Sequence, residues 1–158
     1  MKKLNKKGFT LVELLAVIVV LALIMVLAVP SVLTSMNSAR QSTFLLYAGK
    51  MIEAAQTRYQ SELLLGTPSS SYTVQDLNDS SSTQYKGIVC ISNAASTNPI
   101  YKIQMYDNSY QIGITTNATI GDKTGGVTYA DIEAMKLKLT RNTALQAAPS
   151  TAPTLKCN

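Results

Sequence analysis

The sequence of 158 residues contains no histidine and only two cysteines. Without histidine, the chain cannot carry a Ser-His-Asp triad, a Cys-His pair or imidazole metal ligands. Cys90 and Cys157 are too few and too far apart for a structural zinc site. The aspartates are scattered over separate loops and lack the spacing of a calcium-binding loop. We therefore expect no catalytic site, no metal and no cofactor, and a protein that is not an enzyme.

Acidic residues are absent from the first eight positions, which hold four of the fourteen basic residues: Lys2, Lys3, Lys6 and Lys7. The net charge of +5 therefore comes largely from the N-terminus. The rest of the chain is nearly neutral, because its other ten basic residues are balanced by nine acidic ones. A near-neutral body gives no support for binding to nucleic acid, which relies on clustered positive charge.

A long apolar stretch, residues 9–29, follows the basic start and contains only two polar side chains, Thr10 and Glu13. A helix over this stretch would be about 31 Å long, enough to cross a bilayer core of about 30 Å. The lysines before it place the N-terminus in the cytoplasm. The sequence thus predicts a single membrane-spanning helix.

Glu13 distinguishes this segment from a secretory signal peptide and from a plain membrane anchor. An ionisable side chain inside a membrane helix costs at least about 2.5 kcal/mol on insertion scales, so its usual reason is functional. The apolar stretch is also longer than that of a signal peptide and leads into further helical sequence through Pro30. Neither simple alternative explains the carboxylate.

The segment Lys6–Leu14 (KKGFTLVEL) resembles the processing motif of type IV pilins and pseudopilins. The resemblance implies that a prepilin peptidase cuts between Gly8 and Phe9 and that Phe9 is then N-methylated. It also implies that Glu13, the fifth mature residue, pairs with the α-amino group of a neighbouring subunit during assembly. The short leader is similar to that of the type IVa group. The likeness covers about the first thirty-five residues.

Pro30 lacks a backbone donor and is expected to bend or locally unwind the helix. The resemblance implies melting near residues 22–30 when subunits pack into a filament; a bent but continuous helix is the alternative. Beyond it, seven apolar residues recur at a spacing that places them on one face of a helix: Phe44, Ala48, Met51, Ile52, Ala55, Tyr59 and Leu63. This pattern predicts an amphipathic helix that ends near Leu65, with Gly66 as its C-cap.

The remaining sequence predicts a small β-sheet packed on that helix. Strand patterns occupy residues 87–91, 100–105 and 110–114, and short helices are expected after Thr73 and over residues 129–139. The tail looks irregular. We predict an α+β pilin fold with four parts: a leader (1–8), a membrane and filament-core half-helix (9–30), an amphipathic half-helix (31–65), and a globular head with an antiparallel sheet of three or four strands (66–158).

Cys90 lies in a predicted strand and Cys157 is the penultimate residue. In an oxidising extracellular setting a disulfide would pin the tail, and many pilins carry a C-terminal disulfide. The alternative is two unpaired thiols, one buried and one on a mobile end.

The leading hypothesis is a structural subunit of a type IV pilus, used for adhesion, motility or DNA uptake. Its partners would be further copies of itself, the prepilin peptidase, the inner-membrane assembly platform, minor pilins and, before assembly, membrane lipid. It would span the cytoplasmic membrane once and then join an extracellular filament. The alternatives are a minor pilin or pseudopilin of a secretion or competence system, and a membrane-anchored enzyme.

Gly8→Glu tests the cleavage site. Gly8 has no side chain to obstruct the peptidase or to restrict an extended scissile backbone, and a glutamate would do both. We expect uncut precursor on immunoblots, whereas the milder Gly8→Ala serves as the control. Normal maturation of Gly8→Glu would refute the site.

Overall fold

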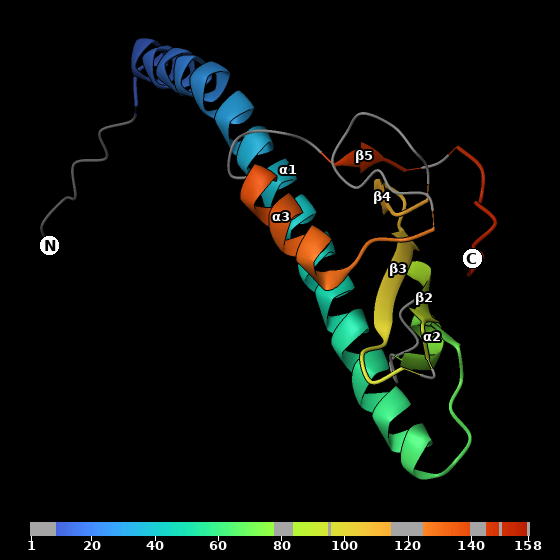
Figure 1. The fold of residues 1–158 in the computed structure, drawn as a ribbon. Coiled ribbons are helices and arrows are strands. Elements are labelled where there is room, and N and C mark those ends of the chain that lie inside the picture. The colour runs from blue at the N-terminus through green and yellow to red at the C-terminus, as the bar shows by residue number, and fades with distance from the viewer. Residues whose placement is uncertain are drawn as a thin grey trace, which may run out of the picture. The chain divides into compact units, whose positions relative to one another are not determined.

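The computed structural model describes residues 9–77, 84–94, 96–114, 125–139, 145–148 and 150–157. In chain order its elements are α1 (Leu11–Leu64), β1 (Ser71–Thr73), α2 (Val74–Leu77), β2 (Lys86–Ser92), β3 (Ile100–Tyr106), β4 (Tyr110–Ile112), α3 (Tyr129–Leu139) and β5 (Gln146–Ala147) (Figure 1). Contacts between Cα atoms divide the chain into two units, Met1–Asn37 and Ser38–Asn158, and α1 contributes to both.

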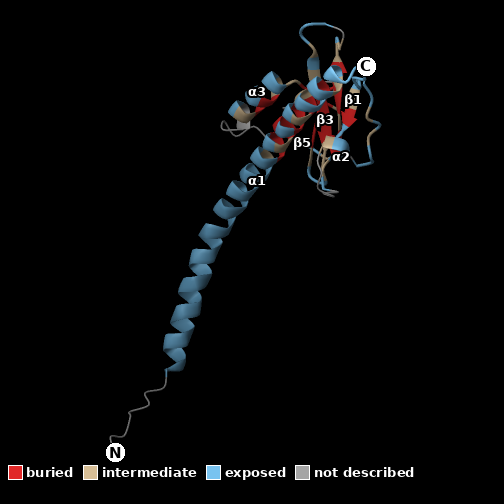
Figure 2. Ribbon diagram, turned by 90° about the horizontal axis from the view of Figure 1, so that it is seen from below, coloured by how far each residue is buried: buried red, intermediate tan, exposed pale blue. Residues whose placement is uncertain are grey.

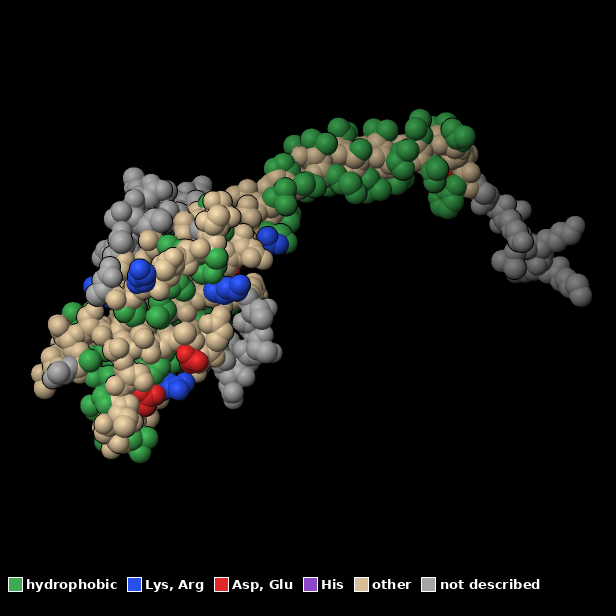
Figure 3. All heavy atoms as spheres, turned by 90° about the vertical axis from the view of Figure 1, so that its right-hand side faces the viewer, with side chains coloured by type: hydrophobic (Ala, Val, Ile, Leu, Met, Phe, Trp, Pro, Cys, Tyr) green, Lys and Arg blue, Asp and Glu red, His purple; other side chains and the backbone are tan. Residues whose placement is uncertain are grey.

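In the first unit, α1 has no buried residue. Every described residue from Phe9 to Asn37 is exposed, although most of these side chains are apolar (Figures 2 and 3). A helix that is apolar on all sides is buried in a membrane or among other helices. This part of α1 therefore needs an apolar environment that the chain itself does not provide.

The second unit contains an antiparallel sheet in the order β1-β2-β3-β4-β5. The predicted α+β fold is confirmed, but the sheet has five strands where three or four were expected. The additional strands are β1 and β5, which have three and two residues. Strands this short leave no period-2 pattern in the sequence, so pattern reasoning misses them.

The predicted strand over residues 110–114 ends early, at Ile112. The chain turns away at Gly113, whose φ of +71° favours glycine. Val127 then pairs with Ile103 of β3 through two backbone hydrogen bonds of 2.8 and 2.9 Å. A distant segment thus takes the edge of β3 that a longer β4 would have occupied.

The core lies between the second part of α1 and one face of the sheet (Figure 2). The residues of α1 that are buried are Phe44, Leu45, Ala48, Gly49, Met51, Ile52, Ala55 and Tyr59. Most of the predicted stripe is confirmed, but Leu45 was missed and Leu63 was wrongly included, since Leu63 is 55% exposed. The buried stripe ends at Tyr59, more than a turn before α1 does.

α1 ends in a Schellman motif, which confirms the prediction that Gly66 caps the C-terminus of this helix. Gly66 has φ +79°, and its N–H donates to the Leu63 carbonyl at 3.2 Å. The Thr67 N–H donates to the Glu62 carbonyl at 3.1 Å. The left-handed residue and the two bonds satisfy carbonyls that the last turn would leave without partners.

Glu62 ties this end of α1 to the following loop. Its carboxylate accepts hydrogen bonds from the Tyr72 hydroxyl at 2.8 Å and from the Ser69 N–H at 3.0 Å. Arg58 Nε donates to the other carboxylate oxygen at 3.1 Å. These donors, Tyr72 above all, lower the pKa of Glu62 to about 2, so the carboxylate stays ionised and keeps accepting. The loop is thereby held against the helix end.

The C-terminal tail is fastened to the opposite face of the sheet. Val89 and Ile91 face α1, so Cys90 between them points to the other face, where it forms a disulfide with Cys157. Next to it, the buried Gln104 amide donates to the Lys156 carbonyl at 2.8 Å and accepts from the Lys156 N–H at 3.3 Å. One covalent bond and two hydrogen bonds therefore hold the tail.

Cys157→Ser tests how much the fastened tail stabilises the head. Loss of a bridge between residues 67 positions apart should lower the free energy of unfolding by about 3–4 kcal/mol. Urea unfolding followed by tyrosine fluorescence measures this, with the double variant Cys90→Ser/Cys157→Ser as control. Unchanged stability would contradict the prediction, as would an intact mass that does not increase by two hydrogens on reduction.

Candidate functional site

The first turn of α1 carries a capping box formed by Thr10 and Glu13. The Thr10 N–H and its hydroxyl donate to Glu13 Oε2, at 2.8 and 2.9 Å. In return the Glu13 N–H donates to Thr10 Oγ1 at 3.3 Å. Three donors at the helix start are satisfied by two side chains, in the pattern expected of T-x-x-E. Thr10 is therefore part of the site, and sequence analysis missed it although the pattern was visible.

The capping box determines where the Glu13 carboxylate lies. It turns the side chain back toward the start of the helix, where unpaired N–H groups and the helix dipole favour negative charge. Among the described residues, both of its side-chain bonds end on Oε2. Oε1 remains able to accept from a donor outside the chain. The Glu13 carboxylate is thus an exposed, negatively charged hydrogen-bond acceptor at the apolar end of the helix.

Phe9 directly precedes the capping box and is 91% exposed. The leader Met1–Gly8 lies outside the described residues, so the Gly8–Phe9 cleavage site and the N-methylation of Phe9 remain predictions. The structure brings Phe9, Thr10 and Glu13 into one turn of chain. An α-amino group created at Phe9 would therefore stand at the same helix end as the carboxylate.

The helix that follows is long and apolar enough to cross a membrane, by length and composition. Its apolar part fits a single membrane anchor. Pro30 lies inside it, and α1 continues through the proline without interruption. The carbonyl four residues earlier, that of Val26, has no proline N–H to accept from. Melting of this region in a filament remains a prediction.

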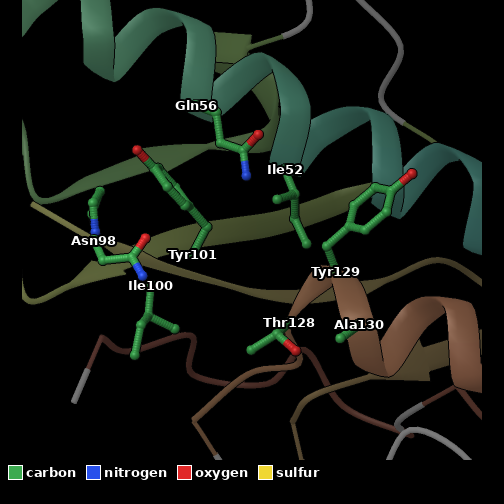
Figure 4. A pocket seen from close by; sticks show the side chains of 9 residues that line it. Ile52, Gln56, Asn98, Ile100, Tyr101, Thr128, Tyr129 and Ala130 are labelled. Carbon is green, nitrogen blue, oxygen red and sulfur yellow. The ribbon is translucent and has the colours of Figure 1, made fainter.

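A second feature of the head is an open groove of about 230 Å³ (Figure 4). Ile52 and Gln56 reach into it from α1, and the rings of Tyr101 and Tyr129 flank it. Its other lining residues are Asn98, Pro99, Ile100, Thr128 and Ala130. No group of three or more His, Cys, Asp or Glu residues that could hold a metal occurs in the described part of the chain. The groove therefore offers apolar surface and amides rather than a catalytic constellation.

Comparison with known proteins supports a class for the chain. A long helix packed on a small antiparallel sheet is an α+β, pilin-like fold. The family model described as the prokaryotic N-terminal methylation motif, the leader of type IV pilins and pseudopilins, matches residues 3–29. This match supports a protein of the type IV pilin or pseudopilin class, a structural class of proteins processed at the leader by prepilin peptidase and assembled into filaments. No curated protein and no solved structure matches the chain.

Thr10→Val tests the capping box. Loss of the hydroxyl removes one acceptor and one donor, which costs about 1 kcal/mol in the first turn. We expect exchange of the Glu13 amide, measured on the mature chain in detergent micelles, to be about fivefold faster than in the wild type. Thr10→Ser retains the hydroxyl and should exchange like the wild type. Equal exchange rates in Thr10→Val and wild type would show that the box is not formed.

Proposed function

We propose that this chain is a structural, non-catalytic subunit of a type IV pilus that polymerises through the first part of α1. The observation that carries the proposal is one anionic hydrogen-bond acceptor, Glu13, at the start of a helix whose next residues, Leu14 to Val29, are all apolar and exposed. A membrane anchor needs no such group, and its insertion is unfavourable. A polymer of parallel helices can use it as a specific contact.

Processing would prepare this contact. Cleavage after Gly8 removes the four leader lysines and exposes a positively charged α-amino group at Phe9, close to the carboxylate of the same turn. Glu13 lies four residues further on, which corresponds to about 6 Å along a helix. A neighbouring subunit displaced by about that distance would bring its Phe9 α-amino group level with this Glu13. Oε1 is the oxygen that remains for the new bond.

The ion pair would also fix the register between subunits. An unpaired carboxylate in an apolar helix bundle is expensive, because its desolvation is offset only by a partner. Any sliding of one helix along another separates Glu13 from the α-amino group and restores that cost. The surface that follows, from Leu14 to Val29, is apolar on all sides and does not by itself select a register.

The same apolar surface would serve in two environments. Before assembly it contacts lipid as a single span of the cytoplasmic membrane, with the N-terminus in the cytoplasm. In the filament it contacts the helices of other copies, and the heads form the outer surface of an extracellular fibre for adhesion, motility or DNA uptake. The partners would be prepilin peptidase, the assembly platform in the inner membrane, minor pilins and further copies of the chain.

The second candidate is a minor pilin or a pseudopilin of a type II secretion or competence system. Both would share the methylation motif, the helix and Glu13. The abundance of the chain in surface fibres sheared from cells separates the two. A major pilin would be the principal protein of those fibres, whereas a minor pilin or pseudopilin would be scarce or absent.

Glu13→Ala tests the assembly contact. We expect the leader to be removed normally and the mature subunit to accumulate in the membrane, with at least a tenfold loss of subunit in sheared fibres, since each subunit loses one intersubunit ion pair. Quantitative immunoblots of the two fractions measure this. Glu133→Ala removes an exposed acid on α3 and is the matched control. Abundant normal fibres from Glu13→Ala would exclude the intersubunit role.

A further inference from the structure

Three consecutive leucines form an exposed apolar tip at the end of α1. Leu63, Leu64 and Leu65, here called the leucine tip, are 55%, 89% and 78% exposed. The tip is held in place, because the Schellman bonds and the Glu62 carboxylate fix the chain on both sides of it. Large side chains held rigidly in solvent are poised to bind at little entropic cost.

The groove on the head, described above, is the concave surface that we pair with the leucine tip. Ile100, at its edge, is 42% exposed, and Ile52 forms its apolar floor. One of its flanking rings is supported from behind. Tyr101 packs edge-on against the buried Tyr59 with centroids 6.1 Å apart. This side of the groove therefore rests on the core of the head.

Within one molecule the tip cannot enter the groove. Leu64 lies twelve residues beyond Ile52 on the same continuous helix, a separation of about 18 Å. A leucine tip that enters the groove must therefore come from another molecule. A second copy of this chain would present that tip as an exposed apolar surface.

The small area of the tip also limits the kind of partner. Burying a leucine side chain contributes about 1.5–3 kcal/mol, and a stable interface usually needs about 800 Å² on each side. Association from free solution costs about 4–15 kcal/mol in lost freedom of motion. Three leucines alone would therefore not hold a freely diffusing partner. They can hold one that is already kept nearby, because tethering raises the effective concentration.

We propose that the leucine tip of one subunit docks into the groove of a second copy that is displaced along α1 toward the C-terminal end of that helix. The proposal rests on the filament function above, in which the first part of α1 keeps the copies parallel and close. The contact joins two different surfaces, so every copy can give its tip to one neighbour and its groove to another. A contact of this type continues without closing, as a fibre requires.

Chemical cross-linking of the full-length chain in its own cells tests the contact. Leu64→Cys is combined with Ile100→Cys, and sheared fibres are treated with a short bis-maleimide, which leaves the native disulfide untouched. A cross-link within one molecule does not join two chains, so only covalent dimers and longer ladders report the contact. The control pairs Leu64→Cys with Ser109→Cys in the turn beyond the other end of β3, which is about 20 Å from Ile100.

We expect covalent dimers and longer ladders from the Ile100→Cys pair and none from the Ser109→Cys pair. Fibres that form but give no cross-link at Ile100→Cys would overturn the tip-and-groove contact and leave the filament function intact. Equal cross-linking of both pairs would also overturn it. Absence of the wild-type chain from surface fibres would contradict the proposed function itself, and the docking proposal with it.

A charge test complements the cross-link. Leu64 is almost fully exposed, so Leu64→Asp should leave the stability of the head unchanged, as measured by thermal unfolding. We expect a three- to tenfold loss of fibres, with partial recovery when Ala130→Lys places an opposite charge on the groove wall. Wild-type fibre yield from Leu64→Asp would overturn the proposal, and so would an unchanged defect in the double variant.

Discussion

The proposed assembly depends on one constraint: a carboxylate at the start of a helix whose next residues, Leu14 to Val29, are all apolar and exposed. In the single chain Thr10 satisfies Oε2 of Glu13, and the remaining oxygen is available to a donor from outside. A carboxylate is costly in lipid and costly in a helix bundle unless it is paired. In the separate subunit, the hydrogen bonds of the capping box offset part of the cost of the Glu13 carboxylate. In the filament, we propose that the α-amino group of a neighbouring subunit offsets the rest.

The head follows from a different constraint, the buried stripe of α1. Phe44 to Tyr59 supply a continuous apolar face, and the sheet covers it. The stripe ends before the helix does, and the last turn with its three leucines extends beyond the core into solvent. On the other face of the sheet, the disulfide and Gln104 hold a tail that has no regular structure of its own. The core is thus held by apolar packing, the leucine tip by the Schellman motif and Glu62, and the tail by the disulfide and Gln104.

The sequence predicted those parts of the fold that depend on local chemistry. Gly66 marked the helix end, Thr73 opened α2, and the spacing of apolar residues located α3 with its observed bounds. The parts it missed depend on distant partners. β1 and β5 are strands only because a neighbour pairs with them, and β4 ends at Ile112 because Val127 takes its place. At the site, Glu13 was identified from its cost in an apolar segment, whereas Thr10 was missed although the T-x-x-E spacing to Glu13 is visible in the sequence. The pairing of the cysteines could not be decided from two positions 67 residues apart.

The most direct test of the central claim is a cryo-electron microscopy structure of the fibres at a resolution that shows side chains. The account predicts that the Glu13 carboxylate of each subunit lies within about 4 Å of the Phe9 α-amino nitrogen of a neighbour, the distance of an ion pair. The claim would be contradicted by a filament in which Glu13 contacts only its own Thr10 and no neighbouring nitrogen is near it.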